Sequence, residues 1–137
     1  MTSPVAPPPA VDLDDDAPPP WLPPGTVRGA RLIAAVSAAV GVVLIAITLA
    51  LGTANSLIPL LAGYLPTFAL VPLILLFGRG GDRVRQAAVG VAALGGLVSC
   101  TGILTGLPPG AVGIVANGAI AALLTRESAR TWFTRQR

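Results

Sequence analysis

Few side chains in this sequence can take part in chemistry, and the most notable of them is Asn117. It lies inside a long apolar run that contains no charged residue. An unpaired amide is costly in an apolar environment, so Asn117 needs a hydrogen-bond partner. The available partners are the hydroxyl side chains of the other runs: Ser37, Thr48, Ser99, Thr101 and Thr105. We expect such a bond to join two helices; contact with a solute is the alternative.

Catalytic and metal-binding chemistry is not indicated. The chain has no histidine and a single cysteine, Cys100, so neither an intrachain disulfide nor a cysteine-based metal site can form. We interpret Cys100 as a compact hydrophobic residue. No acid or base lies inside an apolar run, and no nucleophile–base pair is visible. We therefore predict a protein that is not an enzyme, with no catalytic, cofactor-binding or metal residues and no cofactor.

The charged residues fall into three clusters separated by uncharged apolar runs. The clusters are the N-terminal tail up to Arg31, the patch from Arg79 to Arg85, and the C-terminal tail from Arg126. Only 11% of the residues are charged and 53% are hydrophobic, whereas a soluble domain has about 25% charged residues. Arginine on alternate connections places those connections on the cytoplasmic side. The sequence predicts a multi-pass protein of the plasma membrane with both termini in the cytoplasm.

The predicted fold is an all-α integral membrane protein with one four-helix transmembrane domain at residues 30–127. A stretch of about 20 apolar residues crosses a bilayer core, and the last run is at the short end of this range. The four spans cover about residues 32–51, 57–77, 87–107 and 109–125. Residues 1–29 form a cytoplasmic tail rich in proline and aspartate, which predicts disorder. Residues 128–137 form a basic and aromatic cytoplasmic tail, which we expect to extend the fourth helix.

The third run has the clearest pattern, with small residues that alternate steps of four and three. This spacing places them on one helical face. Small residues hold helices together in lipid because they allow close approach of the backbones. We predict a helix-packing seam formed, together with Asn117, by Ala88, Ala92, Gly95, Ser99, Gly102 and Gly106. The second run has the fewest small residues, and we expect it to face lipid or a partner.

Arginine and aromatic residues flank the runs in the pattern of membrane-interface anchors. We expect anionic headgroups on the cytoplasmic side to contact Arg28, Arg31, Arg79, Arg83, Arg85, Arg126, Arg130, Trp132 and Phe133. The expected partners are therefore the lipid bilayer and either a second copy or another membrane protein. Nucleic acid is not expected despite the high pI, because orientation in the membrane already explains the arginines.

The layout resembles a group of small uncharacterised four-span membrane proteins of actinobacteria. The resemblance lies in the proline-rich tail, residues 24–28 (PGTVR), the four runs, and residues 123–133 (LLTRESARTWF). It implies a fold and a membrane location but no catalytic residue. The length and topology are also close to the small multidrug transporters. That family carries an essential intramembrane glutamate, which none of the four runs here contains, so proton-driven export is not expected.

The leading functional prediction is a non-enzymatic membrane protein that acts by helix–helix association, as a scaffold or accessory subunit. The small-residue seam and the cytoplasmic tail favour it. One alternative is a holin-like or pore-forming protein, favoured by the small size, the hydrophobicity and the basic C-terminal tail. Another is a minor solute transporter that uses Asn117 and a bend at Pro66 and Pro72.

Overall fold

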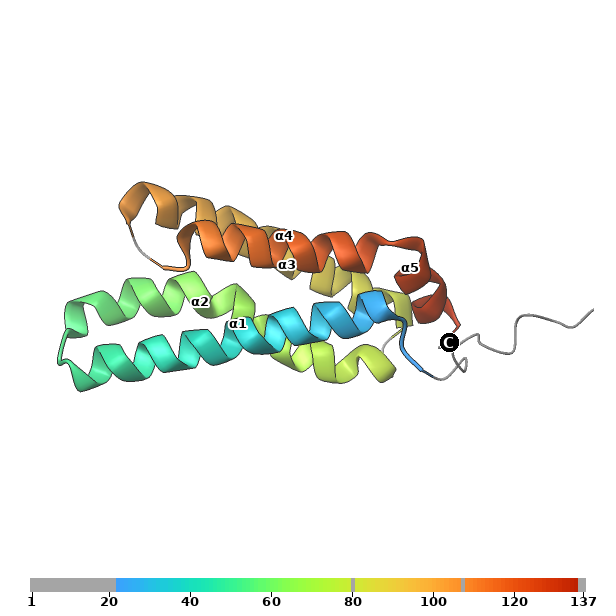
Figure 1. The fold of residues 1–137 in the computed structure, drawn as a ribbon, viewed down its shortest axis with the longest axis horizontal. Coiled ribbons are helices and arrows are strands. Elements are labelled where there is room, and N and C mark those ends of the chain that lie inside the picture. The colour runs from blue at the N-terminus through green and yellow to red at the C-terminus, as the bar shows by residue number, and fades with distance from the viewer. Residues whose placement is uncertain (1–21, 80, 107, 136–137) are drawn as a thin grey trace, which may run out of the picture.

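The computed structural model describes residues 22–79, 81–106 and 108–135, and all the secondary-structure elements in this part of the chain are helices (Figure 1). Most of the proline-rich tail, residues 1–21, lies outside the described residues. The elements are α1 (Gly25–Ala50), α2 (Ala54–Leu75), a 3-10 turn η2 (Leu76–Gly78), α3 (Gly81–Thr105), α4 (Gly110–Thr125) and α5 (Glu127–Thr134). α1 thus begins inside the segment expected to be a tail up to residue 29. The reason is local: the Pro24 carbonyl accepts bonds from the amides of Val27 and Arg28, and Val27 is fully buried.

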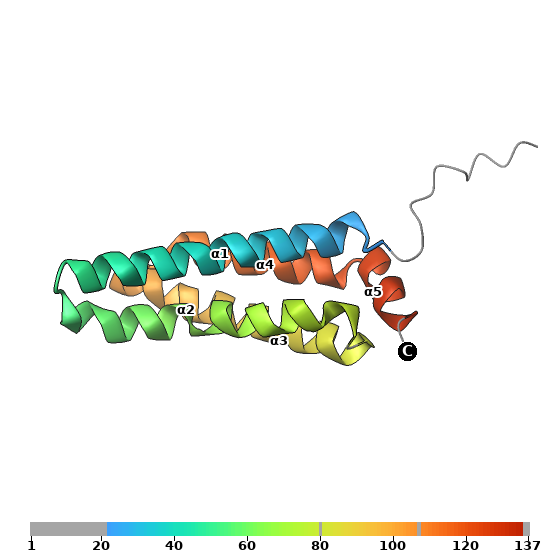
Figure 2. The same cartoon turned by 90° about the horizontal axis from the view of Figure 1, so that it is seen from below.

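The four long helices run up and down beside one another. α1 packs on α2, α2 on α3, α3 on α4, and α4 closes the ring against α1. Figures 1 and 2 place the start of α1, the α2–α3 connection and α5 at one end, with the other two turns at the opposite end. Every charged side chain of the described residues lies at or near the first of these ends. We call it the arginine end.

Three helices are long and apolar enough to cross a membrane: α1, the segment Asn55–Gly78, and α3. α4 is a shorter apolar helix of 16 residues. These helices indicate a membrane location. The least buried of the three long helices is α1, not the second run as expected from its composition. α2 buries a face of its own, which includes Leu60 and Leu70.

The interface between α3 and α4 is the largest in the bundle. The small residues Ala88, Ala92, Gly95, Ser99 and Gly102 all lie on the buried face of α3. Close approach explains why they are small: a Cβ at Gly95 would lie 2.6 Å from Oδ1 of Asn117 on α4. The prediction is wrong at Gly106, which is exposed and lies just beyond α3. Its φ of 69° is the left-handed conformation with which glycine often ends a helix.

An aromatic cluster fills the bundle at the arginine end. Phe77 and Phe133 are almost completely buried, with ring centroids 5.2 Å apart and an edge-to-face angle of 87°. Trp132 packs edge-to-face on Phe133 at 4.9 Å and is only 8% exposed. Trp132 and Phe133 are therefore part of the core, and their prediction as membrane-interface anchors is wrong. Burial of aromatic area against the bundle accounts for this position better than contact with headgroups.

The C-terminal segment does not extend α4. The helix ends at Arg126, whose ψ of 146° is extended, and α5 begins at Glu127. The change of direction carries Ala129, Trp132 and Phe133 under the end of the bundle (Figure 1). α5 thus closes the arginine end, where a continued α4 would leave the Phe77 ring uncovered.

The arginines predicted at the interface divide into exposed and inward-facing residues. The exposed ones are Arg28, Arg79, Arg83, Arg126 and Arg130. Arg85 is buried, contrary to the prediction, because its guanidinium donates to Asp82 Oδ1 at 2.7 Å and to the Leu124 carbonyl at 3.3 Å. Arg31 is half-buried, with its guanidinium 5.7 Å above the centroid of the Phe77 ring, a cation–π distance.

Asp82 lies in the first turn of α3, before the apolar run begins. The hydrogen bond from Arg85 holds the pKa of its carboxyl below the usual value, and the bond from Gln86 adds to this effect. Asp82 therefore stays ionised at neutral pH. Its charge offsets that of the buried Arg85, and this pairing fixes the start of α3 against the end of α4.

Candidate functional site

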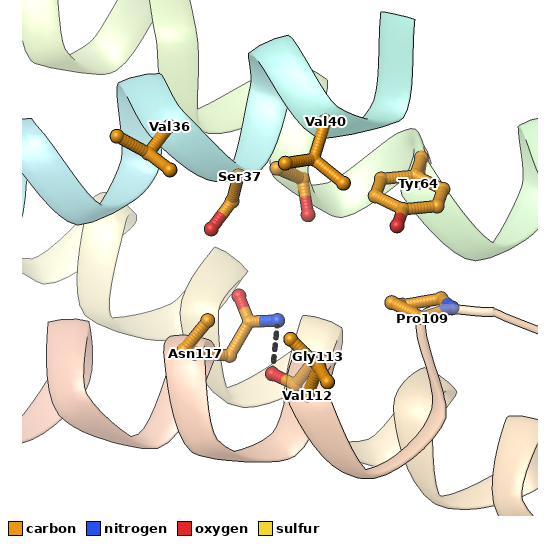
Figure 3. A pocket seen from close by; sticks show the side chains of 10 residues that line it. Val36, Ser37, Val40, Tyr64, Pro109, Val112, Gly113 and Asn117 are labelled. Atoms are coloured by element: carbon orange, nitrogen blue, oxygen red, sulfur yellow. Dashed lines mark hydrogen bonds between the residues drawn. The ribbon is translucent and has the colours of Figure 1, made fainter. Parts of the chain in front are cut away.

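A cavity of about 110 Å³ lies between α1, α2 and α4. Figure 3 shows it from close by. The wall from α1 consists of Val36, Ser37 and Val40, and the wall from α2 of Tyr64 and Thr67. The remaining wall belongs to α4 and the residue before it: Pro109, Val112, Gly113, Ala116 and Asn117.

The cavity brings together polar groups that are far apart in the sequence. Tyr64, Thr67 and Asn117 are only 4–5% exposed, and Ser37 is half-buried. In Figure 3 the Ser37 hydroxyl points toward the Asn117 amide, and the Tyr64 hydroxyl points toward Pro109 across the gap. Among the described residues, the hydroxyls of Ser37, Tyr64 and Thr67 make no hydrogen bond. Three hydroxyls and one amide therefore face a common space.

Asn117 bonds differently from the expectation. Its Nδ2 donates to the Gly113 carbonyl at 2.8 Å, one turn earlier in the same helix (Figure 3). Four of the five expected partners also bond within their own helices. Those four are Thr48, Ser99, Thr101 and Thr105. Hydroxyls in helices commonly bond to a preceding backbone carbonyl, so they are not free to join two helices. The fifth, Ser37, lies across the cavity from Asn117 without a hydrogen bond to it.

Glycines beside the cavity allow the helices to approach one another closely. A Cβ at Gly41 would lie 2.6 Å from Cδ1 of Tyr64, so the bare backbone of α1 allows the tyrosine ring to pack against it. A Cβ at Gly113 would collide with Ser99 Oγ and lie 2.7 Å from Cγ of Pro109. The helices therefore approach closely at the glycines. Next to these close contacts, the small side chains that line the cavity do not fill the space between the helices. The unfilled space is the cavity.

The cavity opens on the outer surface of the bundle, between α1 and α4. Three of its lining residues are also exposed at that surface: Val36 at 55%, Val40 at 46% and Val112 at 77%. An apolar groove of about 440 Å³ adjoins it and shares Val112 and Ala116. The rest of the groove is formed by Ile33, Ala111, Val115 and Ala119. A mostly apolar cavity that contains a few polar groups is thus reached through an apolar entrance.

This arrangement is suited to binding. Hydroxyls and an amide can donate and accept hydrogen bonds, but none of them is an acid or base that works at neutral pH. No charged side chain lines the cavity. Within the described ranges, no three histidine, cysteine or acidic side chains lie together as metal ligands would.

Sequence reasoning identified Asn117 and Ser37 but missed Tyr64 and Thr67. A signal for the latter pair exists: the two polar residues are three positions apart in an otherwise apolar run and so share a helical face. Among the predicted packing residues, the structure brings Gly95 and Ser99 to the α4 side of the cavity.

Comparisons with protein-family models, with curated proteins and with solved structures found no match.

Proposed function

We propose that this chain is an integral protein of the plasma membrane with four spans and both ends in the cytoplasm. The length of the three apolar helices supports this topology, and so does the gathering of charge at one end of the bundle. Arginine on the connections of a single side favours a cytoplasmic position for that side. α4 is the fourth span. Its 16 residues reach about 24 Å, and local thinning of the bilayer or snorkelling of Arg126 makes up the difference.

Within the membrane, the protein acts without catalysis as a scaffold or accessory subunit that associates through its helices. The small-residue face of α3 is used inside the bundle, so association with a partner needs another surface. The outer face of α4 offers one, with Ala111, Gly118 and Ala122 all exposed. A Cβ at Gly118 would meet nothing within 4 Å. This exposed Gly-xxx-Ala pair is the observation that carries the proposal, because such pairs let a second helix approach closely.

The test compares two leucine substitutions in native membranes. Gly118→Leu adds bulk to the outer face of α4, and Gly90→Leu adds the same bulk to an exposed, uncrowded position on α3. We expect chemical crosslinking to capture a second copy or another membrane protein with the wild-type chain. Gly118→Leu should reduce this capture about tenfold, the effect of losing 1–2 kcal/mol of helix association.

Gly90→Leu should leave the capture unchanged. Equal capture by wild type and Gly118→Leu, or an equal loss in both variants, would rule out the outer face of α4 as the contact. Recovery of the wild-type chain without any crosslinked partner would contradict the scaffold function itself.

A further inference from the structure

Three side chains in the cavity are more than nine-tenths buried and have hydrogen-bonding capacity that the described residues do not use. They are Tyr64, Thr67 and Asn117. The Asn117 amide donates one bond to Gly113, and its Oδ1 is directed toward Ser37 in Figure 3. Their polar atoms are accessible from the cavity, because Arg31 Nε is the only fully enclosed side-chain polar atom without a partner among the described residues. These groups can therefore form hydrogen bonds with a molecule in the cavity.

The position of the entrance limits what that occupant can be. The entrance lies between Val36, Val40 and Val112, which are exposed on the outer surface of α1 and α4. In the proposed topology this surface contacts the hydrocarbon of the bilayer. An occupant therefore enters from the lipid.

The lining excludes a charged occupant. The walls contain no charged side chain, and all the described charges lie toward the arginine end. An ion without a counter-charge in an apolar interior is strongly disfavoured. A neutral hydroxyl fits better than a carbonyl, because a hydroxyl both donates and accepts. It can donate to Asn117 Oδ1 and accept from Thr67 or Tyr64.

The volume of the cavity and the shape of its entrance indicate the size and form of the bound molecule. A cavity of about 110 Å³ holds roughly four non-hydrogen atoms, since about 150 Å³ accommodates benzene. The adjoining groove follows α4 from Ala111 to Ala119, about 12 Å along the helix. Its walls are aliphatic, and it runs parallel to the helices as an extended hydrocarbon chain in a bilayer does. The cavity suits a small polar head and the groove suits a tail.

We propose that the cavity between α1, α2 and α4 binds the head of a neutral lipid alcohol, whose hydrocarbon chain lies in the groove between α1 and α4. Asn117 and Thr67 hold the hydroxyl, with Tyr64 and Ser37 beside them. Val36, Val40 and Val112 form the entrance from the lipid. The groove shares Ala111 with the outer face of α4 proposed for association, but Gly118 and Ala122 line neither the groove nor the cavity, so Gly118→Leu tests association without changing this site.

The test uses the full chain in lipid vesicles and photoactivatable hexadecanol that carries a diazirine next to its hydroxyl. The control probe is hexadecane with the same diazirine. Free alcohol in a bilayer keeps its hydroxyl at the headgroup interface, so alcohol label on Val40, well inside α1, reports the site. We expect mass spectrometry to find the alcohol label on Val36, Val40 and Val112, in excess over the alkane label.

Two variants test the hydrogen bonds. Thr67→Val keeps the shape of the side chain and removes its hydroxyl, and should reduce labelling at the entrance about fivefold, the effect of one hydrogen bond. Asn117→Leu should reduce it at least as much. Thr101→Val is the matched control, because its exposed hydroxyl bonds within α3, and it should label as the wild type does.

Several results would overturn the proposal. Equal labelling by the alcohol and the alkane would show that the cavity admits hydrocarbon chains without recognising the hydroxyl. Absence of alcohol label from Val36 and Val40 would show that the cavity does not hold the alcohol. Unchanged labelling in Thr67→Val would exclude the hydroxyl contact. Thr67→Val also keeps the test decisive if Asn117→Leu does not fold.

Discussion

Gly95→Leu is expected to lower the free energy of unfolding by about 3 kcal/mol, the upper part of the range for overpacking a well-packed interior. A Cβ at this position would lie 2.6–2.9 Å from three atoms of the Asn117 side chain. That side chain is buried and bonded to the Gly113 carbonyl, so it cannot move aside without losing this bond. The rest of the leucine would separate α3 from α4 at the largest interface in the bundle.

The control for this prediction is the neighbouring glycine. A Cβ at Gly96 would meet nothing within 4 Å, so Gly96→Leu should keep the stability of the wild type. Both variants are compared by reversible unfolding in mixed micelles, followed by circular dichroism. A stable Gly95→Leu variant, or two variants that lose the same stability, would contradict the close approach of α3 and α4 at Gly95.

Phe133→Ala is expected to cost about 3–5 kcal/mol, the usual effect of removing a fully buried phenylalanine. The Phe133 ring has no exposed surface and contacts both Phe77 and Trp132. Without it, α5 loses its main anchor and should separate from the arginine end. Trypsin should then cleave at Arg130 faster than in the wild-type chain, because a peptide bond inside a docked helix is protected.

Thr134→Ala provides the comparison for Phe133→Ala. Thr134 is the next residue of α5 and is exposed, with its hydroxyl bonded to the Thr131 carbonyl. This variant should unfold and be cleaved like the wild type. If Phe133→Ala behaves like Thr134→Ala in both measurements, the aromatic cluster does not hold α5 in place.

The packed face of α3 is predictable from the sequence because one helix carries the whole signal. The alternating steps of three and four between Ala88 and Gly102 define a face whatever the neighbouring helices do. The end of that face is less predictable. Gly106 continues the spacing, but glycine also terminates helices, and only the backbone distinguishes the two roles.

The position of α5 is ambiguous in the sequence for a different reason. An aromatic pair beside arginines has the same composition in a headgroup anchor and in a helix that covers the end of a bundle. The choice depends on the Phe77 ring, more than 50 residues earlier, against which Phe133 packs edge-to-face. Arg85 is similar, because its burial requires the Leu124 carbonyl at the end of another helix.

The cavity could not be predicted because it is formed between elements. Ser37, Tyr64 and Asn117 come from three helices, and their convergence depends on how each helix is rotated about its axis. Rotation is set by close contacts such as that of Gly41 with the Tyr64 ring. The hydrophobic runs of the sequence predict where the helices are. Because apolar residues cover nearly every side of each helix, these runs do not predict how the helix is rotated about its axis.

Labelling of single cysteines in intact cells tests the four-span topology most directly. Cys100 is first replaced by serine, and a cysteine is then placed at Asn55, Pro108, Arg79 or Arg135, each of which is exposed in the structure and lies outside the apolar spans predicted from the sequence. A membrane-impermeant maleimide should react with the cysteines at 55 and 108 in intact cells, and with those at 79 and 135 only after lysis. Reaction at 79 or 135 in intact cells, protection at 55 or 108, or recovery of the chain in the soluble fraction would contradict the four-span topology.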